Sequence, residues 1–248
     1  MLPGMIRIRQ NFPRPRVGDI PAAVAGSLAA ARLPVKRGDA VAVGAGSRGI
    51  ANIAAIVGAA VRFLQDLGAR PFVFPAMGSH GGGTPEGQLA ILAHYGITEQ
   101  TMGCPVRATM DVVQVGEALG LPVWLDRFAS EADWIGLVNR VKPHTDFKGT
   151  IESGLFKMMT IGLGKHKGAI QYHRTNIHHG YEKVITSVGR EMLSRARIGF
   201  GVGIVENGYD ETARIEASTA RTSKRASAAC SRARGSGWRA CRSDRWTS

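Results

Sequence analysis

The chain has 248 residues, 44% of them hydrophobic, which is enough to bury a sizeable core. Its formal net charge of +13 suggests a nucleic-acid partner, but residues 217–248 alone hold eight basic residues and one acid, so the distribution argues against one. No apolar run approaches the roughly 18 residues of a membrane helix. The N-terminus lacks a secretory leader, and we therefore predict a cytoplasmic protein that does not bind membranes.

The first part of the chain has the pattern of a βα unit. Residues 1–18 predict an edge strand and a Pro- and Arg-rich turn, and Asp19 is placed to cap a helix over 22–32. An apolar strand over 39–45 leads into a glycine turn around Ser47 and Arg48, and an apolar helix follows over 52–67. Such a turn places backbone N–H groups where they attract an anion. Arg48 is then either a surface arginine or a ligand of a carboxylate.

A second glycine-rich loop follows the next predicted strand, at residues 71–76. It contains His80, Gly81, Gly82 and Gly83, and then Thr84 and Pro85 mark the start of a helix that runs to residue 95. Glycines let the backbone approach a ligand closely. Because ligands of α/β folds bind at the carboxyl ends of strands, this position favours a functional role for His80.

Further strands are predicted at 112–115, 122–126, 134–139 and 198–205, with another starting at 213 and helices at 129–133 and 178–195. Strands that alternate with helices predict an α/β fold, with a mostly parallel sheet between helices on both faces as in a Rossmann-like three-layer domain. We assign this domain to residues 1–216.

The character of the sequence changes after residue 216. Residues 217–248 contain no Val, Ile, Leu, Met or Phe and are rich in Arg, Ser and Ala. Such a segment buries too little apolar area to offset its chain entropy, which predicts a disordered basic tail. Our hypothesis is that this tail comes from a shifted reading frame and that a second domain has been lost.

Reactive side chains concentrate between residues 139 and 173. Together with His80 and Arg48 from the glycine turns, His144, Lys157 and His173 of this stretch suit three chemistries: acid–base catalysis by histidines, metal binding by histidine, or a covalent link to lysine. The alternative is a solvated basic face, and we assign Lys165, His166 and Lys167 to it. Lys157 differs because it lies inside the apolar segment LFKMM, where a lysine is costly unless it has a function.

Four segments together resemble the nickel-pincer lactate racemase family. They are GSHGGGTPEGQ, NRVKPHTDFKG, ESGLFKMMTIGLGKHKG and the glycine turn with Arg48, and the resemblance covers about residues 15–216, the family's N-terminal domain. It implies a racemase or epimerase of a lactate-like 2-hydroxy acid. It also implies that the family's second, C-terminal domain is absent.

The resemblance also implies roles for individual residues. Lys157 corresponds to the lysine that carries the nickel-pincer nucleotide, and His173 to a nickel ligand. His80 and His144 correspond to the acid–base pair, and Arg48 to the arginine that binds the substrate carboxylate. The glycine-rich turns, with Gly46, Gly81 and Gly82, would serve the cofactor phosphate. Such a protein needs cofactor-biosynthesis enzymes as partners; a non-catalytic binding module for a phosphorylated or carboxylated metabolite is the alternative.

Overall fold

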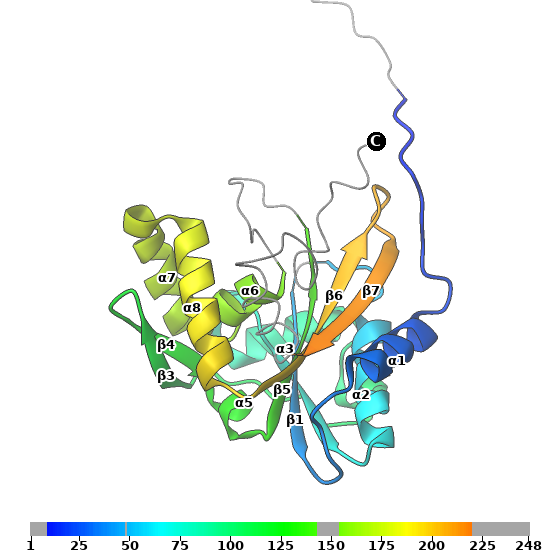
Figure 1. Ribbon diagram of the computed structural model, residues 1–248, viewed down its shortest axis with the longest axis horizontal. Helices are drawn as coiled ribbons and strands as arrows, with labels where there is room; N and C mark the ends of the chain where they lie inside the picture. Colours follow the sequence, from blue (N-terminus) through cyan, green and yellow to red (C-terminus); the bar gives the residue numbers. More distant parts are fainter. Residues whose placement is uncertain (1–8, 48, 143–153, 220–248) are drawn as a thin grey trace, which may run out of the picture.

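The computed structural model describes residues 9–47, 49–142 and 154–219, and these form a five-stranded sheet between two layers of helices (Figure 1). The strand order is β2-β1-β5-β6-β7. The first four of these strands are parallel, and β7 pairs with β6 in the antiparallel direction. The predicted α/β class is therefore confirmed. The strands are β1 (Ala40–Ala45), β2 (Arg70–Pro75), β5 (Trp134–Arg140), β6 (Ile198–Glu206) and β7 (Thr212–Thr219).

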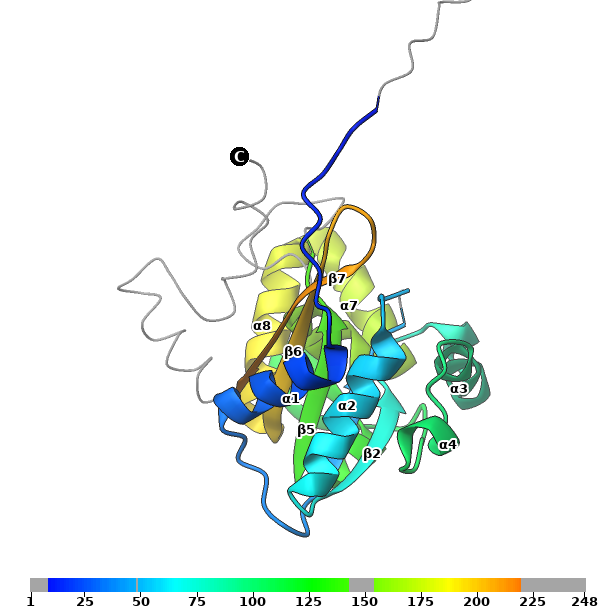
Figure 2. The same ribbon diagram turned by 90° about the vertical axis from the view of Figure 1, so that its right-hand side faces the viewer.

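Side chains alternate across the sheet and so divide the core in two. Val41 and Val43 pack with helices α1 and α2 on one face, whereas Ala42, Phe74 and Leu137 pack on the other with α6, α7, α8 and a β-hairpin. Figures 1 and 2 show the two layers. The helices are α1 (Ile20–Ala31), α2 (Ile53–Asp66), α3 (Pro85–His94), α4 (Glu99–Met102), α5 (Arg127–Glu131), α6 (Leu155–Lys157), α7 (Lys165–His179) and α8 (Tyr181–Arg195).

Helix starts follow the predicted capping residues. The Asp19 carboxylate accepts a hydrogen bond from the amide of Ala22 at 2.9 Å, and the Thr84 hydroxyl accepts one from the amide of Gly87 at 3.1 Å. Both caps satisfy an amide that the helix itself leaves unpaired. The predicted helices at 22–32, 52–67 and 85–95 are α1, α2 and α3, with ends that shift by one or two residues.

Two predicted strands lie outside the main sheet. Residues 112–115 and 122–126 belong to β3 (Val112–Ala118) and β4 (Leu121–Asp126), which form an antiparallel hairpin of their own. The turn consists of Leu119 and Gly120, both with positive φ. A two-residue turn joins antiparallel neighbours only, because a parallel pair needs a long crossover.

Three further expectations need correction. The described part of residues 1–18 contains no strand; residues 1–8 lie outside the description. The predicted helix at 178–195 begins at Tyr181, and a separate helix, α7, precedes it. Strand β7 continues to Thr219, so residues 217–219, which we had placed in the tail, pair with β6. The proposed disorder and origin of residues 220–248 lie outside the described part of the chain.

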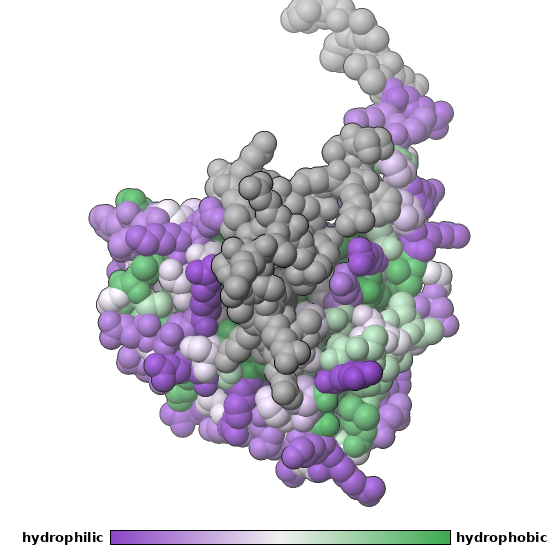
Figure 3. Space-filling view, viewed as in Figure 1, coloured by the Kyte–Doolittle hydropathy of each residue, from purple (hydrophilic) through white to green (hydrophobic). Residues whose placement is uncertain are grey.

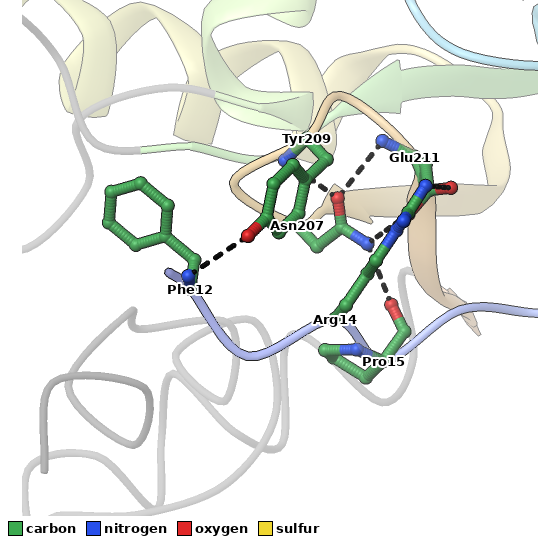
Figure 4. A network of polar contacts seen from close by, with 6 residues as sticks. All are labelled: Phe12, Arg14, Pro15, Asn207, Tyr209 and Glu211. Carbon is green, nitrogen blue, oxygen red and sulfur yellow. Dashed lines mark hydrogen bonds and ion pairs between the residues drawn. The ribbon is translucent and has the colours of Figure 1, made fainter. Parts of the chain in front are cut away.

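The segment before α1 is held against the β6–β7 turn (Figure 4). The Arg14 guanidinium donates two hydrogen bonds to Glu211, at 2.7 and 2.8 Å, and Asn207 donates to Glu211 and to the carbonyl of Pro15. These hydrogen bonds, chiefly the one from Arg14, lower the pKa of Glu211 to about 2. The ring of Phe12 meets Tyr209 edge-on at 6.2 Å. Residues almost two hundred positions apart in sequence are therefore neighbours at this edge of the sheet.

Candidate active site

A cavity of about 130 Å³ opens at the carboxyl ends of β1, β2 and β5. The chain runs from β1 to β2 on one side, whereas β5 and β6 lie on the other side of β1, and α/β sheets bind ligands where the strand order reverses in this way. The turn after β1 contributes Gly46 and Ser47, and the loop after β2 contributes His80. Lys157 reaches the same cavity from the end of α6.

Ser47 and His80 form a hydrogen-bonded pair across the two turns. The Ser47 hydroxyl lies in close contact with Nδ1 of the His80 ring. Tyr95, at the end of α3, fixes this turn: its hydroxyl donates to the carbonyl of Ser47 at 2.9 Å and accepts from the amide of Gly49 at 3.2 Å. Sequence reasoning identified His80 but assigned no role to Ser47 or Tyr95, because their partners are distant in the chain.

The His80 loop lies closely against α3. A Cβ atom on Gly87 would lie 1.9 Å from the carbonyl oxygen of Gly81, so only glycine fits there. Gly81, Gly82 and Gly83 all have φ between 65° and 69°, a left-handed conformation that favours glycine. The glycines of this loop therefore allow a tight turn that brings His80 to the cavity.

Basic side chains line the β5 side of the cavity. Arg140 and Lys142 lie there together with Asn139, and Arg140 forms a close ion pair with Glu206. The Asn139 amide donates to the carbonyl of Gly154 at 3.1 Å, which ties the start of α6 to β5. Arg140, Lys142 and Lys157 thus place three cationic side chains at the cavity, and cationic groups suit an anionic ligand.

The structure brings together some of the predicted site residues. His80, Lys157 and Gly46 line the cavity, and Gly81 and Gly82 follow His80 in the adjoining loop. Arg48 and His144 lie outside the described residues. His173 is exposed on α7, where the Tyr181 hydroxyl lies 3.4 Å from its Nδ1, and it is not among the residues that line the cavity.

The assignment of Lys165 to a solvated basic face is wrong. Its side chain is fully buried. Its neighbours fit the expectation better, since His166 and Lys167 are both exposed, with the Lys167 ammonium 3.6 Å from the centre of the Trp124 ring. Figure 3 shows mainly hydrophilic residues on the α7–α8 side, and Lys165 contributes nothing to this surface. Sequence alone carried no signal for this burial, because Lys165, His166 and Lys167 form one polar run.

The donor set fits part of the cofactor that the sequence resemblance implies. A primary amine at the cavity, that of Lys157, suits a covalent attachment. Within residues 9–47, 49–142 and 154–219, no three His, Cys, Asp or Glu side chains come together to hold a metal ion. The described residues thus fit the tether, whereas His173, the implied nickel ligand, is not among the residues that line the cavity.

The helices of the described segments are all too short or too polar to cross a membrane.

In comparisons with known proteins, no family model matches the sequence and no curated protein matches it. Among solved structures, the fold is similar to that of the lactate racemase apoprotein from Thermoanaerobacterium thermosaccharolyticum, with a TM-score of 0.64 and 13% sequence identity. The match covers 85% of this chain and 54% of that one, so the chain spans about half the length of the structure it matches. The fold of this chain is therefore similar to that of about half of the lactate racemase apoprotein.

Proposed function

We propose that the chain is the α/β domain of a racemase or epimerase of a lactate-like 2-hydroxy acid. The observation that carries this proposal is that one cavity, at the carboxyl ends of the parallel strands, holds both His80 and Lys157. One side chain is suited to proton transfer and the other to holding a cofactor. The similarity of the fold to a lactate racemase apoprotein supports the same reading.

Ser47 equips His80 to transfer a proton in both directions. A hydroxyl group both donates and accepts hydrogen bonds, so Ser47 can pair with Nδ1 whether or not that nitrogen carries a proton. When Nδ1 carries its proton and donates to the Ser47 hydroxyl, Nε2 can accept the substrate proton to form an imidazolium and can later return that proton. A racemase needs both states, because it removes the hydroxyl proton of one enantiomer and returns a proton to form the other.

The remaining roles follow from the family motifs. By their motifs, Arg48 would bind the substrate carboxylate and His144 would be the second acid–base residue. The positive charge of Lys142, at the cavity, would also attract this carboxylate. Lys157 would carry the nickel-pincer nucleotide, which when bound supplies a reversible acceptor for the C2 hydride. Nickel coordination by His173 rests on the motif alone. Enzymes that build the cofactor would be required partners.

The test is to produce the full chain together with the pincer-making enzymes and to measure its intact mass and nickel content. We expect a mononucleotide-sized adduct at Lys157, bound nickel, and loss of optical purity when L-lactate or a related 2-hydroxy acid is added. Lys157→Ala should lose the adduct and the activity. Lys183→Ala, which changes an exposed lysine of α8, should keep both.

A second candidate is a binding module without catalysis. The small cavity with Lys142, Lys157 and Arg140 favours a phosphorylated or carboxylated metabolite even when no cofactor is attached. Calorimetry with phosphate and with lactate on the unmodified chain separates the two functions. Tight binding by a chain that takes up neither adduct nor nickel would favour the module and overturn the racemase proposal.

A further inference from the structure

A buried polar network lies directly beneath the His80 loop. Lys165, Gln88 and Asp126 are all fully buried. The Lys165 ammonium donates to the carbonyl of Pro75 at 2.8 Å and to Oε1 of Gln88 at 2.5 Å, and Oδ2 of Asp126 lies 3.5 Å away. Lys165 therefore connects the start of α7 with the end of β2, with α3 and with the end of β4.

Lys165 determines which way the Gln88 amide faces. An ammonium group has three donors and no acceptor, so the Gln88 atom facing it must be the oxygen. The amide nitrogen then points the other way, where it donates to the carbonyls of Gly78 at 2.8 Å and His80 at 3.2 Å. These two carbonyls belong to the loop that presents His80 to the cavity.

The backbone at Lys165 is also unusual. Its φ is 53°, in the left-handed region that a lysine rarely adopts, and this conformation is found where α7 begins. Such a conformation persists only where surrounding contacts impose it. A buried ion pair is weak evidence for stability, because apolar residues fill the same space at similar or lower cost. Strain and burial at one lysine together indicate a specific role.

We propose that Lys165 is a positioning residue for His80. It fixes the Gln88 amide, and this amide holds the carbonyls of Gly78 and His80 and so keeps the imidazole beside Ser47. Burial lowers the pKa of Lys165, and the Asp126 carboxylate, 3.5 Å away, opposes that shift. The positioning of the ring rests on this geometry; only its importance for proton transfer rests on the proposed function.

The test uses NMR of the full chain without any cofactor, so it does not depend on cofactor loading. Gln88→Glu keeps an oxygen for Lys165 but places a second oxygen against the carbonyls of Gly78 and His80. Lys165→Met removes the ammonium altogether. Lys183→Met is the matched control, since Lys183 is exposed on α8. The readouts are the ring nitrogen shifts of His80 and hydrogen exchange of the Gly83 amide, which donates to the carbonyl of His80 at 3.3 Å.

We expect Gln88→Glu and Lys165→Met to change the His80 nitrogen shifts and to speed exchange at Gly83 by about tenfold or more beyond any change in β1, whose exchange follows the stability of the whole domain. The control should change neither. If both variants lower the melting temperature but leave the His80 shifts unchanged and speed exchange at Gly83 no more than in β1, Lys165 is only structural and the proposal fails. If Lys165→Met does not fold, Gln88→Glu decides alone by the same two readouts.

Discussion

The end of α6 and the start of α7 each carry a lysine, and the two behave in opposite ways. Lys157 has buried neighbours, Phe156 and Met158, yet its own side chain is partly exposed at the cavity. Lys165 precedes two exposed polar residues, yet its side chain is fully buried. Burial of a lysine thus depends on where the backbone directs the side chain, and adjacent residues are a poor guide to it.

The backbone explains the contrast. Residues 155–163 form one continuous helical stretch, in which the apolar side chains face α8 and the sheet while Lys157 turns to the cavity. At Lys165 the left-handed conformation redirects the chain and turns the side chain inward. The first lysine lies at the cavity, whereas the second contacts Pro75, Gln88 and Asp126 inside the protein.

The largest expected effect is on stability at the buried lysine. Lys165→Met should lower the free energy of unfolding by about 3–5 kcal/mol, because it leaves the Asp126 carboxylate buried without its cation. The double variant Lys165→Met with Asp126→Asn should recover much of this loss. Urea unfolding of both variants measures the effect. An unchanged midpoint for the single variant would mean that the buried pair does not stabilise the fold.

Tyr172 is a second buried titratable residue of α7, and its burial predicts that the free energy of unfolding depends on pH. Burial raises its pKa to about 12, and its hydroxyl accepts from the amide of Trp124 and donates to the carbonyl of Pro122. The unfolded chain loses this proton near pH 10 and the folded chain only near pH 12, so stability is lost as pH rises between them. The loss is about 3 kcal/mol for a pKa difference of about two units. Unfolding measured from pH 9 to 12 should show this fall, and Tyr172→Phe should remove that part of it.

A smaller effect on stability is expected at the cavity lysine. Lys157→Met should change the free energy of unfolding by no more than about 1 kcal/mol, since the side chain is partly exposed. The same variant should lose the adduct in the co-production experiment. Comparing its urea midpoint with that of Lys165→Met tests the contrast directly. Equal losses of stability at the two positions would contradict it.

The smallest expected effect is on the ion pair between Arg14, in the segment before α1, and Glu211. Arg14→Ala should raise the pKa of Glu211 from about 2 towards the usual glutamate value, because the main hydrogen-bond donor to this carboxylate is lost. NMR titration of the Glu211 carboxyl carbon measures the shift. Arg16→Ala serves as control, since Arg16 makes only a small electrostatic contribution to Glu211. A titration that stays near pH 2 after the Arg14 change would show that Asn207 suffices.

The sequence by itself determined the order of strands and helices through most of the chain, the caps at Asp19 and Thr84, and the glycine loop around His80. These features depend on local hydrogen bonds and on side-chain periodicity, which neighbouring residues specify. Helix α7 escaped prediction because its buried face is narrow: Ala169, Tyr172 and Asn176 lie among charged and polar residues.

Only the tertiary structure decided which distant residues meet. It separated the β3–β4 hairpin from the main sheet, brought Ser47 and Tyr95 to the His80 loop, and buried Lys165 under that loop. Each of these results depends on contacts between segments far apart in the chain. The physical reason is that burial and hydrogen bonding are set by the packing of whole elements, so local sequence cannot specify them.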